Sequence, residues 1–378
     1  MKRILLFITL VGFLLLSVNC KQTSSTKPST ATTAIVRYAH GFSIQKQAQY
    51  TLLTIKNPWP NSTKTYTYVL AKRQAVIPDS LKIYPTIVVP VKKLVATSTT
   101  HLPSLDMLGE SNALVGFPNL NYISSEKIRA RIEKGKVTEL GNNQNLNTEV
   151  VLNMRPDVII GYGVDHKNSG LDFLEQAGLA VILNGDWNEQ SPLGKAEWIK
   201  LFGVLFCKEA QAEKVFNQIE QSYLRTAELV KNVTHKPTVL AGAMYQDSWY
   251  LPEGNSWAAQ FIATAGGDYL WKDTKGSGSL SLPFELVFEK ASNASIWIGP
   301  GQFSSYHEMA QSSKHYTKFS AFQHKKIVTF SSKKGKTGGV IYYELAPNRP
   351  DLVLQDLVKI LHPTLLPQHN LYFFEPLH

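Results

Sequence analysis

The sequence predicts an α/β protein built from two three-layer α/β/α lobes joined by one long connecting helix, with an additional β-rich segment at its N-terminal end. Three observations lead to this prediction. Short aliphatic runs alternate with helical segments in two separate series, a long helical stretch lies between the series, and residues 35–91 carry strand patterns alone. A chain of 378 residues is long enough for two lobes of ordinary size.

The aliphatic runs of the two series predict buried strands. Each run is continuously apolar, which is typical of parallel strands covered by helices on both faces. The first series comprises residues 94–97, 113–116, 158–161 and 180–183, and the second comprises residues 238–242, 296–299 and 327–330. We therefore expect an N-terminal α/β lobe at residues 92–190 and a C-terminal α/β lobe at residues 235–378.

Residues 191–234, between the two series, predict a helical region. Ser191 followed by Pro192 is a typical helix start, with a capping hydroxyl and Pro at the first helical position. Residues 209–231 then carry apolar side chains at three- and four-residue spacing and contain neither Gly nor Pro. A helix of this length measures about 35 Å, so we expect a rigid connector rather than a loose linker.

Residues 35–91 predict β-structure. Residues 50–55 and 65–70 are rich in Thr, Tyr and aliphatic side chains, and they flank the turn-forming residues 57–61, so a hairpin is expected here. The role of this segment does not follow from the sequence. An added edge sheet and a partner-facing piece are both compatible with it.

The first residues predict export and a lipid anchor. Residues 1–19 have a basic start and an apolar run of about fifteen residues, which fits a signal peptide and is short for a membrane span. Cys20 ends the run and begins a Ser/Thr-rich tether at residues 20–34, so this region resembles a bacterial lipoprotein signal with Cys20 as the lipidated residue. An ordinary secretory signal is the alternative. We expect a protein anchored at the cell envelope, in the periplasm or on the outer face of a bacterial membrane.

The composition excludes some classes of protein. Hydrophobic residues at 43% and charged residues at 18% exclude a disordered chain, and two cysteines exclude a disulfide-stapled scaffold. Cys207, in an apolar helical stretch, is expected to be a buried structural residue. The formal net charge is +10 and becomes +8 without residues 1–19. That surplus is a weak indication of an anionic ligand.

Motifs of common enzymes are absent from the sequence. There is no Gly-x-x-x-x-Gly-Lys-Ser/Thr phosphate loop, and there is no Gly-x-Ser-x-Gly nucleophile elbow. The run beginning at His307 and Glu308 lacks the second His of a zinc-binding motif. Basic runs interleaved with aromatics are also missing, so no nucleic-acid partner is expected. We predict a protein that is not an enzyme, with no cofactor and no resident metal.

Aromatic side chains are concentrated just after the predicted strands. Ligands of open α/β sheets bind beyond the carboxyl ends of the strands, so these residues predict a cleft with large flat walls and polar edges. Hydroxyls near the first strand add hydrogen-bonding groups, and an arginine before the last helix is a candidate either to pair with an anion or to cap that helix. The predicted ligand-binding residues are Thr99, Thr100, Tyr122, Tyr162, Trp187, Tyr245, Trp249, Tyr250, Trp271 and Arg349.

The two series contain a matched acidic residue. Glu149 opens a short helix that leads through a turn into the strand at residues 158–161, and Glu285 does the same before the strand at residues 296–299. An acid in a first helical turn favours the helix dipole, which is an ordinary explanation for one such residue. Its repetition at equivalent places in both lobes makes a functional role an equal alternative.

These features together resemble the class III periplasmic (substrate-binding) proteins of ABC importers, which carry ferric siderophores, cobalamin or haem. The resemblance covers about residues 92–370 and is carried by LNTE at 146–149 with MRPDVII at 154–160, PLGKAEWI at 192–199, WYLPEGNS at 249–256 and AGGDYLW at 265–271. It implies two Rossmann-like lobes that hold the ligand between them. It also implies a partner, an ABC permease with its ATPase, whose arginines meet one surface Glu on each lobe. The matching positions are Glu149 and Glu285.

The resemblance leaves several functions open. The first expectation is a lipid-anchored protein that captures a ferric siderophore or a similarly bulky metal chelate. Cobalamin or haem is the alternative within the family. An exported enzyme acting on a chelate or cofactor, and a surface lipoprotein that uses residues 35–91 for assembly, are alternatives from other classes. Free divalent metal is less favoured, because it requires several convergent His and carboxylate ligands.

Overall fold

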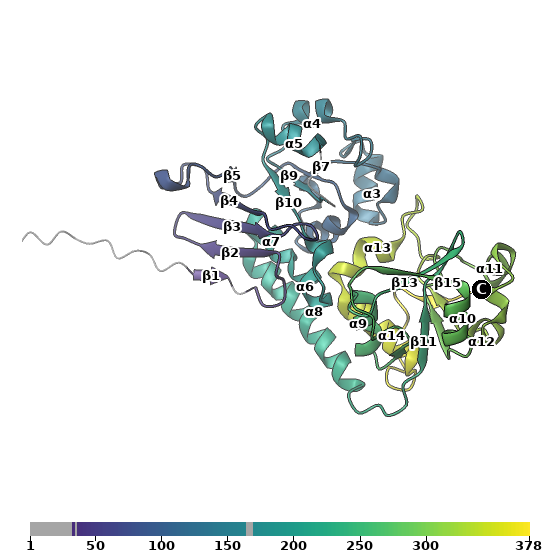
Figure 1. Ribbon diagram of the computed structural model, residues 1–378. Coiled ribbons are helices and arrows are strands. Elements are labelled where there is room, and N and C mark those ends of the chain that lie inside the picture. The colour runs from purple at the N-terminus through teal and green to yellow at the C-terminus, as the bar shows by residue number, and fades with distance from the viewer. Residues whose placement is uncertain (1–31, 35, 164–168) are drawn as a thin grey trace, which may run out of the picture.

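Two separate sheets form the centres of two lobes in the computed structural model, which describes residues 32–34, 36–163 and 169–378 (Figure 1). The N-terminal lobe contains a parallel sheet with strand order β10-β9-β6-β7-β8. Its strands are β6 (Leu94–Ala96), β7 (Leu114–Phe117), β8 (Thr138–Glu139), β9 (Val158–Gly161) and β10 (Val181–Leu183). Its helices are α2 (Leu102–Met107), α3 (Glu126–Glu133), α4 (Thr148–Met154) and α5 (Ser169–Gln176).

The C-terminal lobe contains a second sheet with strand order β14-β11-β16-β17-β18, in which only the edge strand β18 runs antiparallel to its neighbour. Its strands are β11 (Thr238–Ala241), β14 (Asp268–Tyr269), β16 (Ile296–Ile298), β17 (Ile327–Thr329) and β18 (Glu375–Pro376). A smaller antiparallel sheet consists of β12 (Ala243–Tyr245), β13 (Ser248–Pro252) and β15 (Ser279–Pro283). All seven predicted aliphatic runs form strands, and the predicted two-lobe α/β architecture is confirmed.

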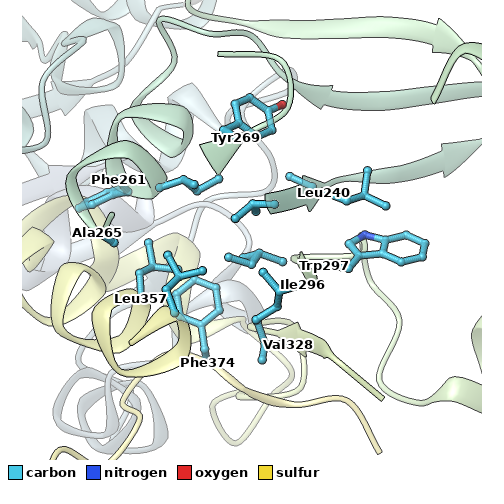
Figure 2. Close-up of a cluster of buried hydrophobic side chains, with 14 of the residues drawn as sticks. Leu240, Phe261, Ala265, Tyr269, Ile296, Trp297, Val328, Leu357 and Phe374 are labelled. Carbon is cyan, nitrogen blue, oxygen red and sulfur yellow. The ribbon is translucent and has the colours of Figure 1, made fainter. Parts of the chain in front are cut away.

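The helices of the C-terminal lobe cover its sheet. They are α9 (Trp257–Thr264), α10 (Phe284–Ala291), α11 (Tyr306–Ser312), α12 (Ser320–Gln323), α13 (Ile341–Leu345) and α14 (Pro350–Leu361). Figure 2 shows Phe261 of α9 and Leu357 of α14 on the same side of the sheet as Ile296 and Val328, while Leu240 lies with Trp297 on the opposite side. Burial of these apolar side chains on the sheet is the main stabilising contribution to the lobe.

The predicted long helix connects the two lobes. It is α8 (Glu209–Leu229), which follows the shorter helices α6 (Pro192–Glu197) and α7 (Ile199–Leu205) and packs along α7 and α14. The prediction that Cys207 is buried is wrong. The chain turns between α7 and α8 with Cys207 in a left-handed conformation (φ 54°), and this turn leaves the side chain exposed.

Residues 35–91 form most of a separate five-stranded sheet, with order β1-β2-β3-β4-β5. Its strands are β1 (Thr32–Ala34), β2 (Phe42–Lys46), β3 (Tyr50–Lys56), β4 (Thr65–Ala71) and β5 (Thr86–Val88), and β3 and β4 are the predicted hairpin. The sheet shares a hydrophobic core with the N-terminal lobe and α7, where the rings of Phe42 and Trp198 lie 4.7 Å apart.

Two buried carboxylates hold the chain that leads into β2. Glu197 accepts hydrogen bonds from the backbone N–H groups of Arg37, Tyr38 and Ala39 at 2.7 to 3.0 Å. Glu189 accepts hydrogen bonds from the backbone N–H groups of His40 and Gly41 and from the indole of Trp198. Because hydrogen bonds to a charged carboxylate are strong, these contacts fix the segment before β2 against α6.

Candidate functional site

A cleft between the lobes consists of two adjoining cavities that share Gln302 and Tyr343 in their walls. The first cavity, of about 480 Å³, is lined by residues of both lobes. The second, of about 1060 Å³, lies along the C-terminal lobe. The amide Nε2 of Gln302 donates a hydrogen bond of 3.1 Å to the Tyr343 hydroxyl, so the two cavities meet at this pair.

The N-terminal lobe contributes the ends of its strands to the first cavity. Thr97 and Thr99 follow β6, Tyr122 follows β7, and Tyr162 comes directly after β9. The expected position of a ligand, beyond the carboxyl ends of parallel strands, therefore coincides with a cavity. The Tyr122 side chain is 65% exposed, so its ring is available to a ligand.

The C-terminal lobe contributes equivalent positions to the second cavity. Its walls contain residues directly after β11, β16 and β17, namely Gly242, Gly299 and Phe330. Tyr245 and Tyr250 stand on neighbouring strands β12 and β13, with ring centroids 6.4 Å apart in an edge-to-face arrangement. Tyr245 is 69% exposed, which leaves most of this aromatic surface without protein packing.

Comparison with known proteins identifies the fold. A sequence model of the family described as periplasmic binding protein matches residues 94–333, which is more than half of the chain. The chain belongs to the periplasmic binding protein family. It is therefore a solute-binding protein of the ABC transporter type and not an enzyme.

Similar chains occur among both known sequences and solved structures. An uncharacterized lipoprotein of Methanocaldococcus jannaschii is 26% identical over 305 residues, covering 78% of this chain and 70% of the relative. The structure of a possible iron-binding (periplasmic solute-binding) protein from Staphylococcus epidermidis matches at 19% identity with a TM-score of 0.55, covering 72% of this chain and 98% of that chain. At such identity the likeness concerns the fold.

The N-terminal sheet has a counterpart among these proteins. The structure of a periplasmic binding protein from Veillonella parvula matches at 15% identity with a TM-score of 0.60, covering 90% of this chain and 98% of that chain. Residues 92–378 make up only about three quarters of the sequence, so a match of 90% must include part of the N-terminal segment. Part of the segment that precedes the N-terminal lobe is thus matched in another structure of this fold.

Five of the predicted ligand-binding residues line the cleft of this periplasmic binding protein. They are Thr99, Tyr122 and Tyr162 in the first cavity and Tyr245 and Tyr250 in the second. That they contact a ligand remains a prediction.

Two tryptophans predicted for the cleft lie in the core instead. Trp249 is 0% exposed, because β13 alternates: Trp249 points inward against Trp297, whose ring lies 5.2 Å away, and Tyr250 points to the cavity. Trp271 follows the edge strand β14 and is buried beside Tyr269. The ammonium group of Lys290 lies 5.4 Å from the centroid of the Trp271 ring. Neither tryptophan lines the cleft.

Three further predicted residues lie outside both cavities. Thr100 donates a hydrogen bond of 2.9 Å to Asp186. Trp187 lies half-buried in the turn before α6, where its carbonyl oxygen accepts a hydrogen bond from Lys195. Arg349 forms two hydrogen bonds of 2.9 Å with Asp351 in the first turn of α14, so its charge is already paired.

One part of the cleft was not predicted from the sequence. It is a loop of the C-terminal lobe that contacts the N-terminal lobe. This bridging loop, residues 333–340, follows β17 and contributes Lys334, Gly338, Gly339 and Val340 to the first cavity. A Cβ atom at Gly339 would overlap the Tyr122 carbonyl group, so only glycine fits this close approach. The three glycines of the loop were the available signal.

Polar contacts fix the bridging loop on the N-terminal lobe. Lys336 forms an ion pair with Glu133 at 2.6 Å, and Thr337 donates a hydrogen bond of 2.8 Å to the carbonyl group of Asn121. The loop also contributes Lys334, Gly335 and Lys336 to a further interlobe cavity, of about 720 Å³, whose wall includes Glu344.

Few charges line the cleft. Among the described residues of its two cavities, Lys334 and Glu308 are the charged side chains. Hydrogen bonds from the backbone N–H and hydroxyl of Ser304, both 2.8 Å, lower the pKa of Glu308, so this carboxylate is ionised near neutral pH. No group of three or more His, Cys, Asp or Glu residues that suits a metal ion occurs in the described ranges.

The two matched glutamates lie on separate lobes and away from the cleft. Glu149 is in the first turn of α4 and Glu285 is in the first turn of α10, and both are exposed. Figure 1 shows α4 and α10 on the outer parts of the two lobes. The predicted signal peptide, tether and Cys20 fall almost wholly outside the described residues, and none of the helices in the described part has the length and apolarity needed to cross a bilayer.

Proposed function

We propose that this periplasmic binding protein captures a ferric siderophore, or a metal chelate of similar bulk, in the cleft between its lobes and delivers it to an ABC permease. The observation that carries the proposal is the aromatic cleft itself. Tyr122, Tyr162, Tyr245, Tyr250 and Tyr343 line two adjoining cavities of about 480 and 1060 Å³. Such a volume exceeds the needs of a free metal ion and suits a bulky ligand with flat surfaces.

The rigid connection between the lobes supports capture by a largely preformed cleft. Helix α8 runs without a break from Glu209 to Leu229, and the bridging loop holds the lobes together through the ion pair of Lys336 and Glu133. A preformed site loses little conformational entropy when the ligand binds. We therefore expect tight binding with small movements of the lobes.

The test is a fluorescence titration of the purified protein against a ferric trihydroxamate, a ferric tris-catecholate, haem and cobalamin. Trp297 donates its indole N–H to the carbonyl group of Gly242 at 2.8 Å, and Gly242 lines the cleft, so a bound iron chelate lies close enough to quench tryptophan emission. Saturable quenching by at least one ferric siderophore at micromolar protein is expected. Quenching by haem or cobalamin alone would reassign the ligand. If none of these compounds quenched the tryptophan fluorescence, the proposal would be contradicted.

A substitution links the signal to the cleft. Tyr343→Ala removes an aromatic side chain shared by both cavities and should weaken binding at least about tenfold, because a buried aromatic contact contributes on the order of 1.5 to 3 kcal/mol. Tyr84→Ala, outside both cavities, is the matched control and should bind as the unmodified protein does. Equal affinity of the two variants would place the ligand elsewhere.

Delivery requires the protein to stay near its permease. Lipidation of Cys20 would hold it at the membrane, and the surface acids Glu149 and Glu285 would then meet basic residues of the permease. The proposed anchor predicts that Cys20→Ser protein is released from the membrane fraction into the soluble fraction. Retention of this variant with the membranes would rule out Cys20 as the anchor.

A further inference from the structure

The charge in the cleft is balanced, although the chain as a whole is strongly basic. Lys334 and Glu308 are the charged side chains among the described lining residues, and their formal charges cancel. The net charge of +10 thus arises elsewhere on the molecule.

The groups that do line the cleft are neutral hydrogen-bond donors on aromatic rings. Burial raises the pKa of the Tyr343 hydroxyl, which therefore stays protonated, and its oxygen accepts the hydrogen bond from Gln302. Phenolic hydroxyls and amides bind the oxygen atoms of a chelate without supplying positive charge. Met244, Phe303 and Phe330 add apolar surface to the same walls.

The balance of charge discriminates between two kinds of iron chelate. Iron(III) bound by three monoanionic hydroxamates is neutral, whereas iron(III) bound by three dianionic catecholates is a trianion. A trianion loses hydration when it enters a cleft, and this cost is recovered only where cationic groups face it. Lys334 is one exposed cation, and Glu308 opposes it with a carboxylate held by Ser304.

From these observations we infer that the cleft selects a metal chelate of little or no net charge, such as a neutral ferric trihydroxamate, over a trianionic ferric tris-catecholate. The inference rests on the proposed function and names the ligand class of the same site. It also replaces the expectation of an anionic ligand drawn from the overall charge, because the basic surplus does not line the cleft.

The experiment compares the affinities of the full protein for a neutral ferric trihydroxamate and a ferric tris-catecholate by isothermal titration at low and high salt. The neutral chelate should bind at least about a hundredfold more tightly and with little dependence on salt. Lys334→Gln, which removes the one cation among the described lining residues, should weaken binding of the trianionic chelate at least about threefold. Lys134→Gln, an exposed lysine outside the cavities, is the matched control for removal of a charge.

A second variant tests the mechanism by adding charge. Gln302→Lys introduces a cation where the two cavities meet and should raise the affinity for the trianionic chelate about tenfold or more, through direct attraction at short distance. Gln176→Lys, at the exposed end of α5, adds the same charge outside the cleft and should have no such effect.

The outcomes separate this inference from the proposed function. Binding of the trianionic chelate as tight as that of the neutral one, or no gain in Gln302→Lys, would overturn the inference and leave a siderophore carrier intact. Binding of neither chelate, with binding of haem or cobalamin, would overturn the ferric siderophore assignment itself.

Discussion

The carboxylate of Glu344, on α13 of the C-terminal lobe, accepts a hydrogen bond of 2.6 Å from the backbone N–H of Ser124 in the N-terminal lobe. Its second oxygen accepts a hydrogen bond of 3.0 Å from the N–H of Ser125, the residue that caps α3. Glu344 is only 3% exposed. Burial, with a further contribution from nearby Asp106, raises the pKa of this carboxyl from 4.5 to about 7 although the two N–H groups oppose the shift.

This interlobe contact predicts a stability that falls as the pH rises from 4.5 to about 7. The folded protein retains the Glu344 proton through this range while the unfolded chain releases it, so deprotonation favours unfolding. The free energy of unfolding should decrease by at most about 3 kcal/mol over this range. Urea unfolding at pH 5 and pH 8 measures this difference in the free energy of unfolding. Glu344→Gln should flatten the dependence, and Glu133→Gln, at the exposed ion pair with Lys336, is the control that should retain it.

The close approach of the bridging loop makes a second prediction. Gly339→Ala places a methyl group against the Tyr122 carbonyl group, which forces the loop away from the N-terminal lobe. We expect a destabilisation of about 1 to 3 kcal/mol and weaker ligand binding, because the loop lines the cleft. Thermal unfolding and titration check both effects. Gly170→Ala in α5, where the added methyl group meets only ordinary contacts, should be neutral. Equal behaviour of the two variants would contradict the proposed role of the loop.

The tryptophan pair beneath the cleft makes a third prediction. The ring centroids of Trp249 and Trp297 lie 5.2 Å apart, and their indole N–H groups donate hydrogen bonds to the carbonyl groups of Ala241 and Gly242, of which Gly242 lines the second cavity. Trp297→Phe should reduce the amplitude of ligand-induced quenching while the Kd stays within about twofold, since Trp297 does not line the cavity. Trp59→Phe, near the N-terminal sheet, should leave the amplitude unchanged. A lost affinity in Trp297→Phe would mean that this side chain shapes the cleft floor.

The architecture was predictable because its signals are local. A continuous aliphatic run such as residues 158–161 must be buried on both faces, and the absence of Gly and Pro from residues 209–231 permits one long helix. The two-residue strands β8, β14 and β18 carried no such signal. They pair with a sheet that the rest of the chain has already formed, so their conformation depends on distant residues.

The cleft was only partly predictable, for a physical reason that Trp249 illustrates. A residue that follows a strand lies near the edge of the sheet at which ligands bind. The direction of its side chain, however, depends on whether the chain forms another strand at that place. Strand β13 alternates, so Trp249 and Tyr250 point to opposite sides. The glycines of residues 333–340 indicated a special loop but not its place in the cleft, because Gly339 meets Tyr122, more than 200 residues earlier in the sequence.

The matched glutamates make the last prediction, which separates transport from binding. Glu149→Arg combined with Glu285→Arg should lower ligand uptake by cells at least about tenfold, because each substitution replaces an attractive charge with a repulsive one at the proposed permease contact. The Kd of the purified variant should stay within about twofold, since both residues lie outside the cleft cavities. Glu126→Arg, in the first turn of α3, is the matched control for the loss of an acid at a helix start. It should leave uptake unchanged. Reduced affinity of the double variant would instead show that these acids act on the ligand, and normal uptake would exclude them from docking.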